Sequence, residues 1–112
     1  MLQLTNDARS QRGRDALKLD KQMSNYAYDH SRAMAQDDTL FHSADLAGVL
    51  GDRDWSMGGE NVGVASSLED LQAAFMDSKL HRKNILQSGF DHAAIGVFES
   101  DGSFWVTVIF YG

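Results

Sequence analysis

The sequence predicts an α+β fold, a three-layer α-β-α sandwich with a small antiparallel sheet at its centre. Near the C-terminus, segments 93–99 and 104–111 flank an Asp-Gly dipeptide, the strongest short signal for a tight β-hairpin. In segment 104–111 both alternating sets of side chains are apolar, so both faces of that strand must be covered. Helical patterns precede the hairpin, and they can supply the two covering layers.

The length of the chain sets the number of domains. Its 112 residues, of which 43% are hydrophobic, are enough for one compact core. No linker composition, internal repeat or low-complexity tract divides the chain, which contains no proline. Residues 1–112 are therefore expected to form a single domain.

Two helices are expected before residue 38. The first runs from Leu2 to about Arg12 and stops at Gly13, a typical residue just after a helix. The second runs from Asp20 to about Gln36, where residues of one helix face recur at spacings of four, three and four. The residues of that face are Met23, Ala27, His30 and Met34.

A long connection and a strand are expected next. Residues 37–59 have no sustained period and contain four glycines, which predicts a surface connection with one short helix near residues 44–50. Connections of this length in small domains are often functional. Residues 60–65 are short and mostly apolar and lead into two serines, so a strand followed by a helix start is expected there.

The following helix is expected from about Leu68 to Ser78. Ser66, followed three residues later by Glu69, matches the capping-box pattern of a helix N-terminus. If the helix continues beyond its expected end, Asp77 and His81 lie four residues apart on one face. Such a pair can be structural as well as functional.

Composition and charge exclude several classes of protein. The formal net charge is -6, and protonation of all four histidines would still leave it negative, so a nucleic-acid partner is not expected. No apolar stretch is long enough to span a membrane, and the first residues do not match a signal peptide. The absence of cysteine excludes disulfides and any metal site that needs sulfur.

Three residues that can carry chemistry lie in loops or at element ends: His42, Glu60 and His81. Two glycines before Glu60 allow a sharp turn that presents its carboxylate, which can ligate a metal or orient an imidazole. Asp77 is a second acid near His81. If they converge, these are the ligand types that zinc or another divalent metal accepts with a position open for water. Spacing alone leaves their convergence open, and a solvated glutamate after a glycine turn is the simpler alternative.

Other candidates have structural interpretations. His30 falls within the apolar helix face and is expected to be a core histidine, and His92 is expected to be a solvated residue at a strand start. Ser43 and Ser78 lie near histidines, but neither has the turn or the third member of a catalytic triad. No glycine pattern for nucleotide phosphates is present.

Several short motifs, in this order, resemble the CAP superfamily of cysteine-rich secretory, antigen 5 and pathogenesis-related 1 proteins, also called the SCP domain. The most specific motifs are Phe41-His42-Ser43, Gly59-Glu60-Asn61 and Ser78-Lys79-Leu80-His81-Arg82-Lys83-Asn84-Ile85-Leu86. The lack of cysteine is typical of the bacterial type. Lys79-Leu80 departs from the Pro-Gly that bacterial relatives often have before this histidine.

The resemblance implies an α-β-α sandwich with a cleft lined by two histidines and two acids, where several members bind zinc or another divalent ion. His42, Glu60 and His81 match three of these metal-site positions, and Asp77 is the candidate for the fourth by proximity. The resemblance also implies a secreted or cell-surface location. The chain is thus expected to be an extracytoplasmic, monomeric domain of a longer exported protein whose signal peptide lies outside it.

Three functions follow as hypotheses. The first is an extracellular binding module, without enzymatic activity, whose metal-capable cleft recognises a protein, lipid or cell-surface ligand. The alternative is a metal-assisted peptide or ester hydrolase, in which Glu60 acts as general base on a zinc-bound water and Asn61 or Arg82 steadies the oxyanion. In the third hypothesis the site is purely structural: His42 and His81 form hydrogen bonds with the carboxylates and hold the 37–59 connection in place. The missing nucleophile favours the binding module.

Overall fold

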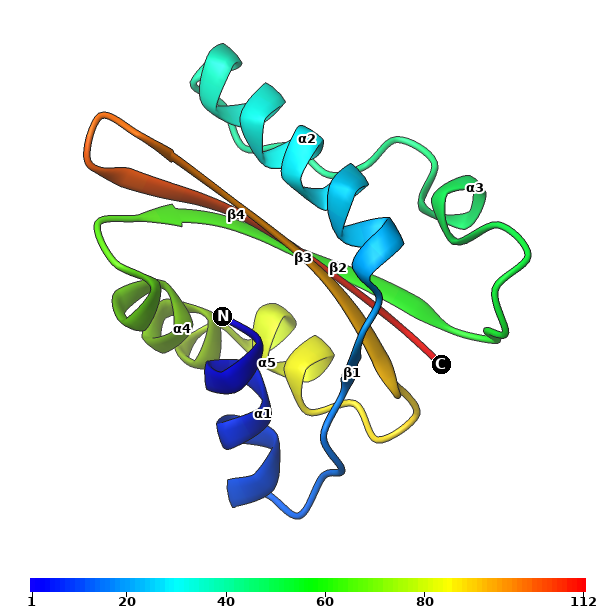
Figure 1. Cartoon of the computed structure of the whole chain (residues 1–112). Coiled ribbons are helices and arrows are strands. Elements are labelled where there is room, and N and C mark those ends of the chain that lie inside the picture. The colour runs from blue at the N-terminus through cyan, green and yellow to red at the C-terminus, as the bar shows by residue number, and fades with distance from the viewer.

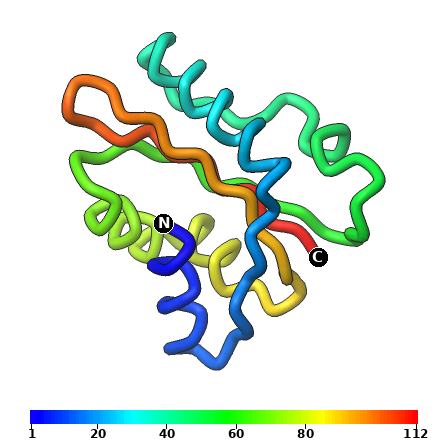
Figure 2. The backbone as a smooth tube through the Cα atoms, viewed as in Figure 1, coloured from blue at the N-terminus to red at the C-terminus, as the bar shows by residue number.

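A computed structural model describes all 112 residues and places helices on both faces of a four-stranded sheet (Figure 1). In chain order the elements are α1 (Leu2–Gln11), β1 (Lys18–Leu19), α2 (Lys21–Asp37), α3 (Leu46–Leu50), β2 (Gly58–Ala65), α4 (Leu68–Asp77), α5 (Lys79–Ile85), β3 (His92–Ser100) and β4 (Ser103–Tyr111). Figure 2 shows the chain passing from α1 in one layer, through β1, to α2 in the other. The predicted α-β-α sandwich is confirmed.

The sheet has the strand order β1-β3-β4-β2. The predicted hairpin joins β3 to β4, with Ser100 opposite Ser103 and positive φ at Asp101 (51°) and Gly102 (78°), as a type I′ turn requires. β2 pairs antiparallel with the other side of β4. One pairing was not expected: β1 adds a parallel edge to β3, and its two residues are too few to leave a periodic pattern.

Both faces of β4 are covered, as its apolar pattern predicts. Val106, Val108 and Phe110 pack on one side with Leu71 and Phe75 of α4. On the other side, Ile109 and Tyr111 pack with Met23 of α2 and Leu50 of α3, and Trp105 packs with Met34 of α2. The two helical layers therefore share one central strand as their common core.

The helix α2 begins where the sequence predicts. Asp20 caps it, because its carboxylate accepts a hydrogen bond from the Met23 N–H at 2.9 Å. The predicted apolar face is buried against the sheet. α2 lies so close to β3 that a Cβ on Gly96 would stand 2.1 Å from the backbone of Ala27, so only glycine fits there.

One expectation about the helix after β2 is wrong, and one alternative that the sequence left open is decided. Its N-cap is Ser67, not Ser66, and the Ser67 hydroxyl accepts from the Asp70 N–H at 3.1 Å. The helix also does not continue to His81, because Ser78 takes extended backbone angles (φ -93°, ψ 121°) and separates α4 from α5. Asp77 and His81 consequently lie on different helices. None of the helices is long and apolar enough to cross a membrane.

Candidate functional site

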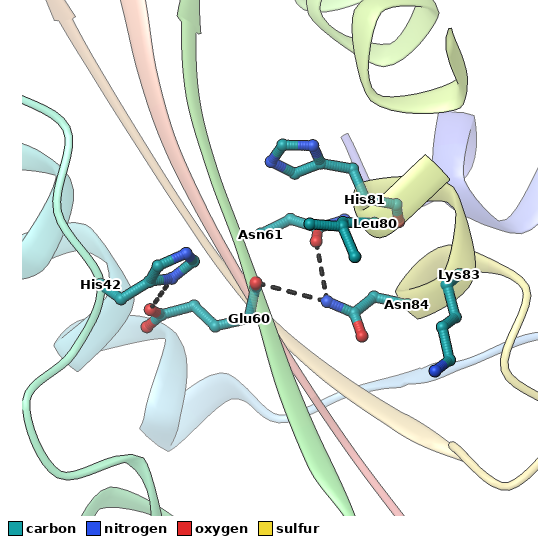
Figure 3. A pocket seen from close by; sticks show the side chains of 7 residues that line it. All are labelled: His42, Glu60, Asn61, Leu80, His81, Lys83 and Asn84. Atoms are coloured by element: carbon teal, nitrogen blue, oxygen red, sulfur yellow. Dashed lines mark hydrogen bonds and ion pairs between the residues drawn. The ribbon is translucent and has the colours of Figure 1, made fainter. Parts of the chain in front are cut away.

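A polar cavity of about 340 Å³ opens where β2 passes between the α2–α3 connection and α5 (Figure 3). The residues that line it are His42, Glu60, Asn61, Leu80, His81, Lys83 and Asn84. Only Leu80 among them is hydrophobic. The cavity therefore suits a ligand with hydrogen-bonding groups.

Glu60 holds one wall of this cavity together. Its side chain is 4% exposed and accepts three hydrogen bonds, from His42 Nδ1 (2.8 Å), the Ser43 N–H (2.8 Å) and the Ser43 hydroxyl (2.5 Å). Tyr26 of α2 donates in turn to the Ser43 hydroxyl at 2.7 Å. A carboxylate only accepts, so the His42 proton lies on Nδ1 and Nε2 is left available to a ligand. The His42 side chain is 63% exposed.

His81 forms part of the opposite wall. Its ring stacks on Phe75 with centroids 4.9 Å apart, and its Nδ1 lies 2.7 Å from the Ser78 hydroxyl, the same residue that separates α4 from α5. Burial, and next the charge of a protonated His42, lower the pKa of His81, while the backbone of Val62 acts in the opposite direction. The neutral form of His81 is therefore favoured.

Two asparagines fix the distance between the walls. Asn61 of β2 is 1% exposed and donates to the His81 carbonyl at 3.0 Å. Asn84 of α5 donates to Asn61 Oδ1 at 2.9 Å and to the Glu60 carbonyl at 3.3 Å. A Cβ on Gly59 would lie 2.7 Å from Asn84 Oδ1, so the glycine leaves room for this amide. Together these bonds tie α5 to β2.

The structure brings together three of the four predicted metal-site residues. His42, Glu60 and His81 line one cavity, whereas Asp77 is exposed at the end of α4 and does not line it. Asn84 and Lys83 line the cavity but were not predicted as site residues. The sequence feature that could have pointed to them is their position two and three residues after His81, within the motif from Ser78 to Leu86. His30 is a core histidine as expected, buried with its Nε2 2.7 Å from the Phe41 carbonyl.

The donor set falls short of a complete metal site. No three His, Cys, Asp or Glu side chains lie together in a way that could hold a metal ion. Both carboxylate oxygens of Glu60 already accept hydrogen bonds, which leaves the imidazoles of His42 and His81 as ligands. Two protein ligands are one fewer than the usual three of a catalytic zinc site. Glu60 instead matches the carboxylate that orients a ligating histidine from behind.

The chain is similar to proteins of Bacillus. It is 33% identical to the uncharacterized protein YkwD of Bacillus subtilis over 94% of this chain and 43% of YkwD. It is 32% identical to the uncharacterized membrane protein YlbC of the same organism over 87% of this chain and 30% of YlbC. The chain thus spans less than half the length of these relatives.

A solved structure and a family profile agree with these relatives. The crystal structure of an extracellular protein containing an SCP domain from Bacillus anthracis superposes with a TM-score of 0.81 at 29% identity, over 98% of this chain and 38% of that chain. The sequence profile of the Cysteine-rich secretory protein family, CAP, matches residues 2–110. Although it has no cysteine, the chain belongs to the CAP family.

Proposed function

We propose that this domain is an extracytoplasmic binding module that recognises a polar ligand in the cleft between His42 and His81. One observation carries the proposal: each imidazole has its Nδ1 held by a neighbour, Glu60 or Ser78, in the wall of a polar cavity. Side chains fixed in this way bind with little loss of conformational entropy. The extracellular SCP-domain protein of Bacillus anthracis supports a location outside the cytoplasm.

This proposal includes a divalent ion, such as zinc, as one component of the ligand. His42 and His81 would hold it, and their remaining positions would be completed by water or by ligand atoms. When bound, such an ion supplies Lewis-acid chemistry. The hydrolase alternative has less support, because the Glu60 oxygens are engaged by His42 and Ser43 and are not free to act as general base.

Calorimetry tests whether His42 and His81 bind zinc. Zinc is titrated into the chelator-treated domain and into the His42→Ala, His81→Ala and His92→Ala variants. We expect heat in the wild-type domain, lost in the first two variants and kept in His92→Ala, because His92 lies outside the cavity. Binding that survives both cavity substitutions would place the metal elsewhere.

Amide chemical shifts test the cleft itself. The ¹⁵N-labelled domain is titrated separately with zinc and with a short peptide. We expect at least one probe to shift the signals of Asn61, His81 and Asn84 together, and the His81→Ala variant to weaken that response. If no probe moves these signals, the cleft is not a ligand site.

A further inference from the structure

A second polar cavity, of about 260 Å³, lies between the C-terminal end of α2 and the β3–β4 turn. We call it the hairpin cavity, and its lining residues are Ala35, Asp38, Ser100, Asp101, Ser103 and Trp105. Figure 1 shows the β3–β4 turn and the C-terminal end of α2 at the same end of the molecule. None of these residues lines the cleft between His42 and His81, so the hairpin cavity is a separate candidate site.

Trp105 gives the clearest indication of a ligand. The residue is 7% exposed and packs under α2. A buried indole N–H usually has a hydrogen-bond acceptor, as the Trp55 N–H has in the Gly51 carbonyl at 3.0 Å. The Trp105 N–H has no acceptor within the chain, yet it is not fully enclosed, because Gln72 Oε1 is the only fully enclosed side-chain polar atom without a partner. Since Trp105 lines the hairpin cavity, its N–H opens toward that cavity.

The other polar side chains of the hairpin cavity also lack partners within the chain. Asp38 and Asp101 take part in none of the four ion pairs. No side-chain hydrogen bond involves their carboxylates or the hydroxyls of Ser100 and Ser103. All five polar side chains around the cavity are therefore available to a ligand.

These five side chains define the chemistry of the ligand. An ionised carboxylate only accepts hydrogen bonds, an indole N–H only donates, and a hydroxyl does both. A bare cation would neutralise the carboxylates but would leave the Trp105 N–H without an acceptor. A peptide unit has one N–H and therefore cannot donate to both carboxylates. Adjacent hydroxyls on a sugar ring each donate and accept, so one ring can satisfy the whole set.

The size of the hairpin cavity limits the ligand to one small unit. Pockets for small molecules begin at about 300 Å³, and the 260 Å³ of this cavity lies just below that volume. Ala35 and Trp105 supply apolar surface against which the C–H groups of a ring can pack. Asp38 and Asp101 are exposed, so a chain attached to the ring can leave the cavity past them.

We propose that the hairpin cavity binds a sugar ring, either free or at the end of a glycan. One ring hydroxyl accepts from the Trp105 N–H, and neighbouring hydroxyls donate to the carboxylates of Asp38 and Asp101. The inference is independent of the proposed function, because the two cavities share no residue.

The indole N–H signals of the two tryptophans locate the binding. The ¹⁵N-labelled domain is titrated with the methyl glycosides of glucose, galactose and mannose up to about 50 mM, because a ligand of about a dozen non-hydrogen atoms is expected to have a millimolar Kd. We expect at least one glycoside to shift the Trp105 indole signal until it saturates. The Trp55 indole signal is the internal control and should not move, since its N–H is bonded to Gly51 outside the cavity.

A disaccharide distinguishes the two sources of the sugar ring. The preferred sugar is presented at the non-reducing end of a disaccharide, and the titration is repeated. Binding at least as tight as that of the methyl glycoside supports the end of a glycan as the ligand. Binding of the methyl glycoside alone supports a free sugar.

Substitutions of aspartate test the polar contacts. Asp38→Asn and Asp101→Asn each remove an ionised acceptor and keep the backbone, because both positions have positive φ, which asparagine tolerates. We expect each to weaken glycoside binding about five- to tenfold, since hydrogen bonds to ionised groups are roughly twice as strong as neutral ones. Asp37→Asn is the matched control and should bind like the wild type, because Asp37 is exposed next to Asp38 but does not line the cavity.

The possible outcomes are distinct. If no glycoside shifts the Trp105 indole signal, or if both cavity variants bind as tightly as the wild type, the inference is wrong. Calcium chloride and methylammonium chloride are titrated in parallel, and a response to either of them with none to the glycosides would make this a cation site and overturn the sugar. The signals of Asn61, His81 and Asn84 in the other cleft decide the proposed function separately.

Discussion

Arg9 shows how much a single residue organises. It is 1% exposed, and its guanidinium donates to the carbonyls of Asp15, Ile85, Gln87 and Phe90 at 2.8 to 3.2 Å. Burial, and next the positive charge of Arg14, lower the pKa of Arg9. No carboxylate pairs with the group, so its role is to satisfy carbonyls where α5 ends and the chain turns toward β3.

We expect Arg9→Met to destabilise the domain by about 3 kcal/mol, because it leaves buried carbonyl oxygens without donors. Urea unfolding followed by circular dichroism measures the change. Arg12→Met, at an exposed position just after α1, is the matched control and should cost little. If Arg9→Met lowers the free energy of unfolding no more than Arg12→Met does, water molecules take over the hydrogen bonds to the buried carbonyls.

At the scale of elements, the cleft depends on how α5 is attached to β2. The attachment is made by Asn84, Asn61 and the His81 carbonyl. α5 could not take this position as a continuation of α4, because the extended backbone of Ser78 redirects the chain between them. The break also places the Ser78 hydroxyl against His81. One serine thereby sets both the direction of α5 and the orientation of an imidazole.

Asn84→Ala should cost about 1 to 2 kcal/mol, because Asn61 Oδ1 then loses its donor inside a buried site. For this variant we expect a lower midpoint temperature of thermal unfolding and faster amide hydrogen exchange in α5. Lys83→Ala, the exposed neighbour, is the control for helix propensity. Equal midpoints for the two variants would mean that α5 is held by its apolar contacts alone.

The close contact between α2 and β3 gives another prediction at this scale. Gly96→Ala should cost about 3 kcal/mol or more, because the new Cβ meets the α2 backbone at 2.1 Å and a packed helix cannot withdraw without losing contacts. Gly63→Ala meets only side chains of Leu71 and Phe75, at 2.7 to 3.1 Å, and should cost less. Denaturant unfolding of both variants compares the costs, and the reverse order would contradict this account.

At the scale of the whole molecule, one polar cluster joins three distant parts of the chain. Asp20 at the start of α2 accepts from Arg53 at 2.6 Å and from the Tyr111 hydroxyl at 2.8 Å. Arg53 belongs to the connection between α3 and β2, and Tyr111 ends β4. The cluster thus closes the helical layer of α2 and α3 onto the end of the sheet.

This cluster predicts a pH dependence of stability. Burial alone would raise the pKa of Asp20, but hydrogen bonds from Arg53, the Met23 N–H and Tyr111 outweigh it and lower the pKa from 3.8 to about 2. The stabilisation is therefore complete above pH 4 and is lost as the pH falls toward 2, about 2 kcal/mol in all. Urea unfolding at several pH values should show this loss in the wild type and a smaller one in Asp20→Asn. Parallel curves for the two proteins would assign the acid sensitivity to other carboxyls.

The sequence by itself determined the elements whose signals are local. The buried face of α2 follows from its spacing, and the hairpin follows from Asp101-Gly102, because both depend on backbone preferences within a few residues. The two apolar faces of β4 in turn required two helical layers. The candidate residues His42, Glu60 and His81 were recognisable from their motifs and from their position at element ends.

The tertiary structure decided what depends on distant parts of the chain. Pairing of β1 with β3 needs a register that two residues cannot specify. Asp77 is separated from the cleft by the extended backbone angles of Ser78. Serine readily takes such angles next to a helix, but a serine in the sequence does not by itself predict them. The orienting role of Glu60 depends on Ser43, a residue 17 positions away in sequence. Hydrogen bonds between such segments form only when the sheet and its layers have assembled, so they leave no periodic trace in the sequence.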